Sequence, residues 1–408
     1  MSNSIQTVDL VANAILSEFV NNNSLLLTGA RTYEQDFQME DYQVGDSLRI
    51  RKQNVFNVSD GRISTPQDVI EEVETLKIAH QFNSEINYTS KELTLFVNTG
   101  QGPFNERYIR PLVQEITKKM EETIATQAIS EIYNYAGSPG TPINSFAAVD
   151  IISAQMQELG MPVFPNSYMA LTPRDASALK SVLQNSFNPT LNEDISFYSS
   201  LGHLSIFDIF SNQSLKRFSA GNLTGTPLVN GAVSSGNTIV IDGLGGGSVL
   251  NVGDILTFGT FGASSAVNSV NPIGRQDTGQ LASFVVTQAA VEAGSSITAV
   301  VNPAIISDVA NPRRNVSQAI PDNAPVALVG STLTYNNNLA YTDRGLDIVI
   351  PPLAKLSNVE ASVVTDKDVN VSIRVQRDGD IRNDINVLRV DVLCGFKWHP
   401  QYAVRVLS

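Results

Sequence analysis

Residues Pro111–Tyr135 read PLVQEITKKMEETIATQAISEIYNY, and their apolar positions recur at the spacing of one helix face. The stripe consists of Ile109, Leu112, Val113, Ile116, Met120, Ile124 and Ile132. Ala136-Gly137 follows, and glycine commonly ends a helix because it adopts the left-handed conformation without strain. The pattern predicts a long helix over about residues 103–137, with Pro111 at its start or at a kink. The stretch from Pro111 to Tyr135 would be roughly 37 Å long at about 1.5 Å per residue.

A two-stranded hairpin is expected before this helix, over about residues 44–90. Leu48–Lys52 alternates apolar and basic residues, and the return strand alternates through Leu76, Ile78, His80 and Phe82. Turn residues at Ser59-Asp60-Gly61 separate the two strands. The charged side chains of the hairpin can pair with each other or with a neighbouring molecule. The candidate contact residues are Arg49, Arg51, Lys52, Arg62, Glu71, Glu72 and Glu74.

Helices and strands are mixed in the rest of the chain before residue 222. Helical spacing of apolar residues predicts amphipathic helices over Ser4–Phe19, Ser145–Leu159 and Pro173–Leu183. Thr172 is the expected N-cap of the last of these helices. Tyr168–Leu171 is expected to form a strand.

Residues 222–335 differ in composition from their flanks. They contain six acids, three bases, no lysine and 14 of the 27 glycines of the chain. Five short runs rich in β-branched residues recur between Gly, Asn, Ser and Pro clusters, which is typical of a small barrel or sandwich. The runs are Thr238–Ile241, Asp254–Phe258, Ala282–Thr287, Ile297–Val301 and Pro325–Val329. The pattern indicates an inserted all-β domain.

A β-rich tail follows this block. Asp347–Ile350 is one expected strand, and a second alternates through Val369, Val371, Ile373 and Val375. Asp378-Gly379 is a turn signal after the second strand. The last strand is expected over Val387–Trp398, with Val390, Val392, Cys394, Phe396 and Trp398 on one face. The chain as a whole is therefore of the α+β class.

The composition excludes several classes of function. The 408 residues have a net charge of -13, and 16% are charged, against about 25% in a typical soluble protein. An acidic chain repels phosphate, which argues against a protein that reads or wraps nucleic acid. No apolar run reaches about 18 residues, so no membrane span is expected. The N-terminus lacks the features of a signal peptide, and a single cysteine, Cys394, excludes internal disulfides.

The sequence contains no recognisable catalytic or metal-binding pattern. The histidines lie far apart, at His80, His203 and His399, and His80 is expected to be a packed strand residue. A strand pattern follows the glycine run Gly243–Ser248, where a dinucleotide loop requires a helix, so a turn is expected there. The aspartates Asp378, Asp380 and Asp384 lack the later glutamate of a calcium loop. The sequence predicts no enzyme, cofactor or metal site, and its hairpin and low charge favour self-association.

The order of these elements resembles that of tailed-bacteriophage major capsid proteins of the HK97 type, and most closely the P22-like coat proteins, which carry an inserted β domain. Seven stretches carry the resemblance: Ser167–Pro173, Gly253–Phe258, Ala266–Pro272, Arg275–Gly279, Leu281–Thr287, Leu393–Trp398 and Ala403–Leu407. The resemblance covers essentially the whole chain.

The resemblance implies an HK97-like shell domain over residues 1–221 and 336–408, interrupted by the inserted barrel-like β domain over residues 222–335. Within the shell domain it implies an N-terminal arm at about 1–43, an extended hairpin (the E-loop) at about 44–90 and a spine helix at about 103–137. The peripheral and axial α/β parts would be residues 138–221 and 336–408.

The resemblance also implies a function. The protein would be a major capsid protein whose hexamers and pentamers form an icosahedral head that encloses double-stranded DNA without binding it specifically. Its partners would be its own copies, a scaffolding protein and a portal, with no membrane contact. It would assemble in the host bacterial cytoplasm and reside in the virion.

Other interpretations stay open at this point. An encapsulin, the shell protein of a bacterial compartment, shares the HK97-type fold, although its usual members lack an inserted β domain of this size. A non-catalytic β-rich surface protein would need a signal peptide, and a hydrolase would need a nucleophile–base pair. Some coats of this fold cross-link a hairpin lysine to a neighbouring asparagine. Lys52 is the only lysine near the outer strand, and no matching glutamate is identifiable, so no cross-link is expected.

Overall fold

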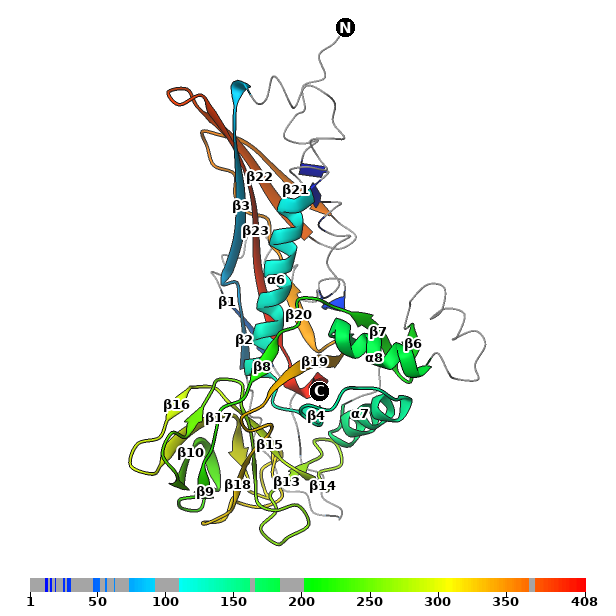
Figure 1. Ribbon diagram of the computed structural model, residues 1–408, viewed down its shortest axis with the longest axis vertical. Helices are drawn as coiled ribbons and strands as arrows, with labels where there is room; N and C mark the ends of the chain where they lie inside the picture. The colour runs from blue at the N-terminus through cyan, green and yellow to red at the C-terminus, as the bar shows by residue number, and fades with distance from the viewer. Residues whose placement is uncertain are drawn as a thin grey trace. The chain divides into compact units, whose positions relative to one another are not determined.

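The computed structural model describes two compact units of the chain. The first contains residues 1–50, 73–124 and 346–397, and the second contains residues 51–72, 125–345 and 398–408. Both units mix strands with helices, as expected for the α+β class (Figure 1). The described residues are 12, 13, 15, 16, 19, 25, 28–30, 47–51, 56, 62, 73–91, 110–161, 166–183, 202–366 and 371–408.

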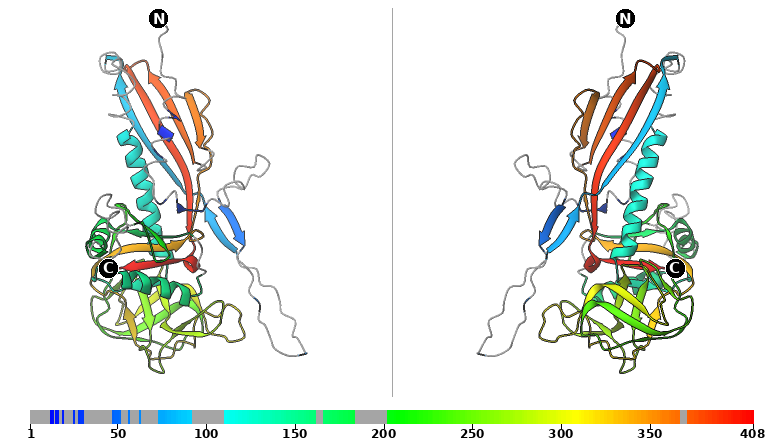
Figure 2. Two further views of the ribbon diagram at one scale, coloured as in Figure 1. Left: turned by 90° about the vertical axis from the view of Figure 1, so that its right-hand side faces the viewer. Right: turned by 90° about the vertical axis from the view of Figure 1, so that its left-hand side faces the viewer.

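A five-stranded sheet forms the centre of the first unit. Its strands are β3 (His80–Thr89), β20 (Leu346–Val349), β21 (Glu360–Asp366), β22 (Val371–Asp380) and β23 (Ile385–Trp398). The order is β20-β23-β22-β21, and β3 pairs antiparallel with β23 from His80↔Cys394 to Thr89↔Ile385. Helix α6 (Arg110–Glu131) runs alongside this sheet (Figure 2).

Helix α6 confirms the expected long helix but is shorter than predicted. Its described apolar stripe is buried, from Leu112 at 8% exposed to Ile124 and Ile132 at 0%. The predicted C-terminal end at residue 137 is wrong, because Tyr135–Gly137 forms a short strand, β4, that pairs parallel with the C-terminal strand. The predicted residues 103–109 lie outside the described residues.

The expected hairpin is confirmed by strands β1 (Ser47–Arg51) and β2 (Val73–Lys77), which form a two-stranded sheet. Its apolar face packs in a small cluster of Ile50, Leu76 and Val349. The continuous return strand predicted through Leu76–Phe82 is wrong, because the chain leaves β2 at Lys77 and joins the larger sheet at His80. Gly395 of β23 allows the backbone at Lys77 to pass close to β23, since a Cβ at residue 395 would lie 2.6 Å from the carbonyl oxygen of Lys77.

The predicted N-terminal helix and arm lie mostly outside the described residues. Within the predicted helix, the described residues Ala12, Asn13, Ile15, Leu16 and Phe19 are helical, and all of them except Asn13 are buried. The backbone N–H of Leu25 donates to a carboxylate oxygen of Glu121 in α6, at 3.1 Å. Ala30 exchanges backbone hydrogen bonds with β20. These contacts anchor the described part of the arm to the first unit.

A seven-stranded sheet forms one part of the second unit. Its order is β4-β24-β19-β5-β7-β6, and β8 also pairs with β19. The strands besides β4 are β5 (Ser167–Leu171), β6 (His203–Leu204), β7 (Phe207–Ser211), β8 (Arg217–Ser219), β19 (Thr334–Thr342) and β24 (Ala403–Leu407). A short 3-10 turn, η4 (Pro400–Tyr402), precedes β24.

Two helices cover this sheet at the expected positions. Helix α7 (Phe146–Glu158) begins after Ser145, whose hydroxyl accepts a hydrogen bond from the backbone N–H of Ala148 at 3.1 Å. Helix α8 (Pro173–Leu183) begins after Thr172, as predicted. Apolar residues of α7, α8, β5, β7 and β24 share one buried core.

The block 222–335 forms a six-stranded sheet with the order β18-β12-β15-β17-β10-β9. The strands are β9 (Gly225–Val229), β10 (Ser235–Leu244), β12 (Ile255–Phe258), β15 (Ser283–Val286), β17 (Ile297–Ile306) and β18 (Val326–Leu328). Each of the five predicted runs contributes a strand to this sheet. Leu228 of the edge strand β9 forms a bridge with Pro325, next to the opposite edge strand β18, so the sheet comes close to closing on itself.

Two small sheets complete this block. β11 (Val249–Leu250) pairs with β16 (Ala290–Val291), and β13 (Asn268–Val270) pairs with β14 (Asp277–Leu281). Gly243 and Leu244 of the glycine run end β10, and residues 245–248 connect it to β11 as a turn, as predicted. The main core cluster of the block is composed of its own side chains, from Val229 to Val326. A smaller cluster joins Ile255 and Tyr335 of the block to Ile129, Phe218 and Leu407 outside it.

The C-terminal strands confirm one prediction and correct another. The five residues predicted on one face of β23 are all buried, including Cys394 and Trp398 at 0% exposed. The turn predicted at Asp378-Gly379 is wrong, because β22 continues to Asp380 and Gly379 pairs with Asn386 of β23. The reversal lies at residues 381–384.

Candidate functional site

The candidate contact residues of the hairpin are only partly described. Arg49 and Arg51 lie on β1 and are exposed, and Arg62 is also exposed. The Glu74 carboxylate on β2 lies 3.6 Å from the ammonium nitrogen of Lys397 on β23, so it pairs within its own chain. Lys52, Glu71 and Glu72 lie outside the described residues. The structure therefore brings one acidic candidate to the sheet and leaves three basic ones on the surface.

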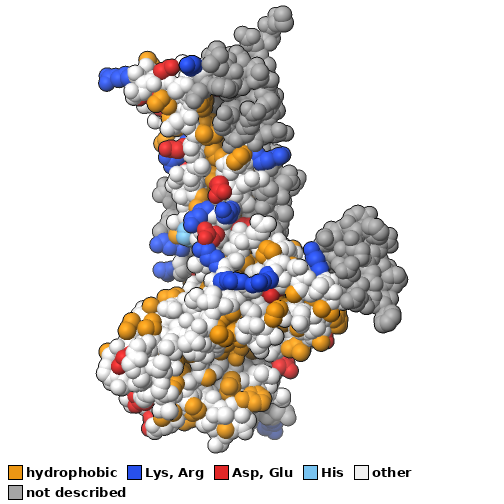
Figure 3. Space-filling view, viewed as in Figure 1, with side chains coloured by type: hydrophobic (Ala, Val, Ile, Leu, Met, Phe, Trp, Pro, Cys, Tyr) orange, Lys and Arg blue, Asp and Glu red, His pale blue; other side chains and the backbone are white. Residues whose placement is uncertain are grey.

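Charged side chains are unevenly distributed over the visible surface. Charged side chains (blue and red) are frequent over β3 and α6. The visible face of the 222–335 block is mostly hydrophobic (orange) or uncharged polar and backbone (white) (Figure 3). This distribution follows the sequence, in which only nine charged residues lie between 222 and 335.

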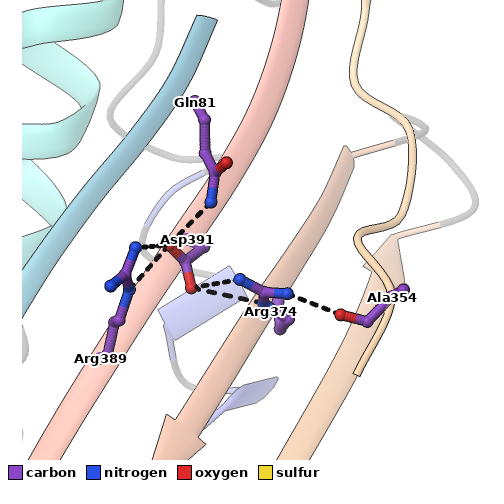
Figure 4. Close-up of polar contacts among 5 residues, drawn as sticks. All are labelled: Gln81, Ala354, Arg374, Arg389 and Asp391. Atoms are coloured by element: carbon purple, nitrogen blue, oxygen red, sulfur yellow. Dashed lines mark hydrogen bonds and ion pairs between the residues drawn. The ribbon is translucent and has the colours of Figure 1, made fainter. Parts of the chain in front are cut away.

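A buried ionic cluster on the large sheet of the first unit was not predicted. The Asp391 carboxylate of β23 is 0% exposed and accepts hydrogen bonds from the Arg374 guanidinium of β22, at 2.9 and 3.3 Å. Arg389 donates to the other carboxylate oxygen at 3.0 Å, and Gln81 of β3 donates to the same oxygen at 3.3 Å (Figure 4). Arg374 also donates to the carbonyl oxygen of Ala354 at 2.6 Å.

This Asp391 cluster ties three neighbouring strands together. An isolated carboxylate at 0% exposure would be strongly destabilising, but two guanidinium groups and an amide satisfy its oxygens. The Arg374 side chain is 9% exposed, whereas the Arg389 side chain is 40% exposed, so only the first pair is fully withdrawn from water. The role of the cluster is structural, because both oxygens of the Asp391 carboxylate already accept hydrogen bonds within the chain.

A second buried charge lies on the C-terminal strand of the second unit. The Arg405 guanidinium of β24 is 0% exposed and donates from Nη1 to the carbonyl oxygens of Ile129 at 3.1 Å and Gly253 at 2.7 Å. Its Nε donates to the side-chain oxygen of Asn337 at 2.9 Å. Arg405 thereby joins the end of α6, the turn before β12 and strand β19.

Titratable neighbours of Arg405 have shifted pKa values. Burial raises the pKa of Asp254 above its usual value, although backbone N–H groups of Asn251 and Gly221 donate to its carboxylate. Burial lowers the pKa of Arg405 to about 10 and raises the pKa of Tyr335 to about 12. The largest cause of all three pKa shifts is the withdrawal of these groups from water.

A third polar cluster centres on Asp175 in the first turn of α8. Its Oδ2 accepts from the hydroxyls of Thr172 and Ser408, both at 2.7 Å, and from the Asn338 amide at 2.9 Å. The Thr172 hydroxyl thus donates to Asp175, while the backbone oxygen of Thr172 accepts from Ala176. The cluster ties the start of α8 to strand β19 and to Ser408, which follows β24.

The histidine and cysteine of the large sheet are packing residues, as expected. The His80 ring stacks on Phe396 with centroids 5.1 Å apart and on Phe82 at 5.9 Å. Burial raises the pKa of the Cys394 thiol, which makes it a poor nucleophile. Among the residues that the structure describes, no group of three or more His, Cys, Asp or Glu is arranged to hold a metal ion. No helix within those same ranges is long and apolar enough to cross a membrane.

One sequence signal could have indicated a buried charge. Arg405 lies between Val404 and Val406 in an apolar strand, and a charge in such a strand needs buried partners. The sequence signal for the buried Asp391 cluster is weaker. Polar residues that alternate with apolar ones in a strand normally face water, and only the register of β22 against β23 pairs Arg374 with Asp391.

Residues 81–403 match the family model described as P22 coat protein, gene protein 5. Among curated proteins, no sequence matches the chain. Solved structures with a similar chain include Mycobacterium phage Che8, at 10% identity and a TM-score of 0.47, covering 95% of this chain and 90% of that one. The capsid of Ralstonia phage GP4 matches at 7% identity and a TM-score of 0.48, covering 94% and 88%. A virus-like particle from Pyrococcus furiosus matches at 10% identity and a TM-score of 0.39, covering 98% of both chains.

Proposed function

This chain belongs to the P22 coat protein family, and we propose that its copies form the hexamers and pentamers of an icosahedral bacteriophage head around double-stranded DNA. It is a major capsid protein of the virion, with a structural role and not an enzymatic one. The observation that carries this conclusion is the family match, which extends over most of the chain. The same match favours a phage coat over an encapsulin.

The fold we propose is an HK97-like shell domain, residues 1–221 and 336–408, interrupted by an inserted barrel-like domain, residues 222–335. Two observations support the inserted domain. Its main core cluster contains only side chains of the block itself, and the bridge between Leu228 and Pro325 nearly closes its six-stranded sheet. A segment with its own core and few charges can fold without the rest of the chain.

The isolated fragment 222–335 tests this domain assignment. We expect a single cooperative urea transition by circular dichroism, because the fragment retains every residue of its main core cluster. A featureless, gradual loss of signal would contradict an independent inserted domain.

The hairpin of β1 and β2 is the proposed contact with a neighbouring subunit. The side chains of Arg49, Arg51 and Arg62 are exposed and would meet acidic surface there, together with Lys52. The acidic candidates Glu71 and Glu72 would meet basic groups of the neighbour, whereas Glu74 pairs with Lys397 of its own chain. Each exposed pair contributes only about 0–1 kcal/mol. Repetition over many subunits makes such weak contacts effective in a closed shell.

A scaffolding protein and a portal are the further partners of the proposal, and the host cytoplasm is the proposed place of assembly. The net charge of -13 supports a shell that encloses DNA without clamping it, because like charges repel. Negative-stain microscopy of the expressed protein, with and without the scaffolding protein, tests the assembly. Closed shells of uniform diameter are expected, and monomers that never assemble under either condition would overturn the proposal.

A further inference from the structure

Asn230 and Gly231 form the only Asn-Gly pair in the sequence, and they lie in the turn that follows β9. An asparagine followed by glycine is prone to deamidation, in which the backbone nitrogen of the glycine attacks the side-chain carbonyl carbon of the asparagine. Glycine favours this attack because it has no Cβ to hinder the approach. Both residues are exposed, and Gly231 has a φ of 85° with nothing within 4 Å of a Cβ placed there. The pair is therefore open to water and sterically unhindered.

A carboxylate contacts the nitrogen that would attack. The backbone N–H of Gly231 donates to Oδ1 of Asp322 at 2.8 Å. The other oxygen, Oδ2, accepts from the side-chain amide of Asn323 at 2.9 Å, and the backbone N–H of Asn323 donates to the carbonyl oxygen of Val229 at 2.9 Å. These bonds hold the carboxylate beside Gly231. A charged acceptor strengthens the hydrogen bond and is able to take the proton.

The Asn230 side chain is available for reaction. Its backbone N–H donates to the carbonyl oxygen of Val240 at 2.8 Å, which fixes the residue, but its side-chain amide forms no hydrogen bond with any described residue. Other asparagines of the block are engaged through their amides, since Asn268 donates to Asp277 at 3.0 Å and Asn315 donates to a backbone carbonyl oxygen at 2.7 Å.

The Asn-Gly pair lies at the seam where the six-stranded sheet comes close to closing. Before the pair, the backbone N–H of Val229 donates to the carbonyl oxygen of Ala324 at 3.0 Å. After the pair, Val233 and Ile320 exchange two backbone hydrogen bonds, both at 2.9 Å. An isoaspartate would lengthen the backbone between these bonds, and an aspartate would add a carboxylate beside Asp322. Like charges on paired segments are destabilising, so either product would weaken the seam.

We propose that Asn230 is a self-modification site, which deamidates with Asp322 as the base, and that its conversion loosens the seam of the block. Asp322 takes the proton of the Gly231 N–H as this nitrogen bonds to the side-chain carbonyl carbon of Asn230. The bond from that carbon to the side-chain nitrogen then breaks, and the nitrogen leaves as ammonia after it receives a proton. Water opens the resulting succinimide to aspartate or isoaspartate, so the net reaction consumes water and releases ammonia.

Peptide mapping by mass spectrometry over time measures this reaction in the full, unassembled chain. The chain is incubated at mildly alkaline pH, either folded or unfolded in urea. Gly231 and Asp322 are 91 positions apart, so unfolding separates them and the rate in urea is that of the Asn-Gly pair alone. We expect deamidation at Asn230 to be several-fold faster in the folded chain, because only the folded chain places the base.

Asp322→Asn tests the base directly, because it removes the charge and keeps the size of the side chain. We expect it to abolish the excess rate of the folded chain. Asp308→Asn is the matched control, since Asp308 is an exposed acid of the same block that accepts from the backbone N–H of Ala310 at 3.0 Å. This control should keep the wild-type rate.

The urea midpoint of the aged chain measures the effect on the seam. We expect the midpoint to fall as Asn230 converts, whereas an Asn230→Gln chain aged in parallel should keep its starting midpoint. A folded rate no higher than the rate in urea would overturn the inference, and this comparison needs no variant. A wild-type rate in Asp322→Asn that folds by circular dichroism, or an unchanged midpoint in the converted chain, would also overturn it.

Discussion

Replacement of Asp391 by alanine tests the ionic cluster of the large sheet. The substitution removes both hydrogen bonds from Arg374, at 2.9 and 3.3 Å, and leaves a cation whose side chain is 9% exposed with the Ala354 carbonyl oxygen as its remaining partner in the cluster. Removal of one member of a buried ion pair costs about 3–5 kcal/mol, mostly because the other charge stays buried. The expected loss of unfolding free energy for Asp391→Ala is therefore about 3–5 kcal/mol.

Two further variants separate the contributions within the cluster. Arg389→Ala removes a side chain that is 40% exposed, so its loss is expected at about 0–1 kcal/mol. The double variant Asp391→Ala with Arg374→Ala leaves no uncompensated buried charge from this pair, so it should be less destabilised than the sum of its single variants.

Urea unfolding of the unassembled subunit, followed by circular dichroism, gives these free energies under one set of conditions. The interpretation is wrong if Asp391→Ala costs less than about 1 kcal/mol, or if Arg389→Ala costs as much as Asp391→Ala.

Three other outcomes are expected. Burial raises the pKa of Asp254 above 3.8, so its contribution to stability is full below the unfolded pKa and is lost as pH rises through the folded pKa. Urea midpoints measured from about pH 4 upward should show a weaker decline in Asp254→Asn, and an unchanged decline would contradict this sign. Gly253→Ala should cost about 1–3 kcal/mol, because its φ is +98° and a Cβ would lie 2.4 Å from the Ile129 side chain. The control Gly246→Ala, which meets nothing within 4 Å, should stay within about 0.5 kcal/mol, and equal melting temperatures of the two variants would refute the steric argument. Assembled shells boiled in detergent should run as a 44.0 kDa band, whereas a ladder would show that Lys52 or another lysine forms a cross-link.

Local patterns predicted most of the individual elements. The apolar stripe of α6, the bounds of α7 and α8, and the strands of the block 222–335 depend on residues close in the sequence, and those predictions are confirmed. The wrong predictions concern features that depend on residues far apart in the sequence. The break after Lys77 depends on β23 passing at Gly395, and the end of α6 depends on pairing of β4 with β24.

The buried charges illustrate the same limit. The partners of Arg405 lie 276, 152 and 68 positions away in the sequence, at Ile129, Gly253 and Asn337. Alternation within a strand predicts that Arg374 and Asp391 lie on a face exposed to water. In the structure both residues are buried, and this burial makes their pairing important for stability. The exposed hairpin candidates Arg49, Arg51 and Arg62 were identifiable from the sequence because a surface role needs no buried partner. Their contact with a neighbour stays a prediction.

The central claim is that this chain is the shell subunit of a DNA-containing phage head. Cryo-electron microscopy of DNA-filled particles from infected cells, combined with protein mass spectrometry of the same particles, tests it most directly. The account predicts that this chain is the most abundant particle protein and that its two units fit the repeating density of hexamers and pentamers. Particles that lack the chain, or shell density that cannot contain its α6 helix and its 222–335 block, would contradict the claim.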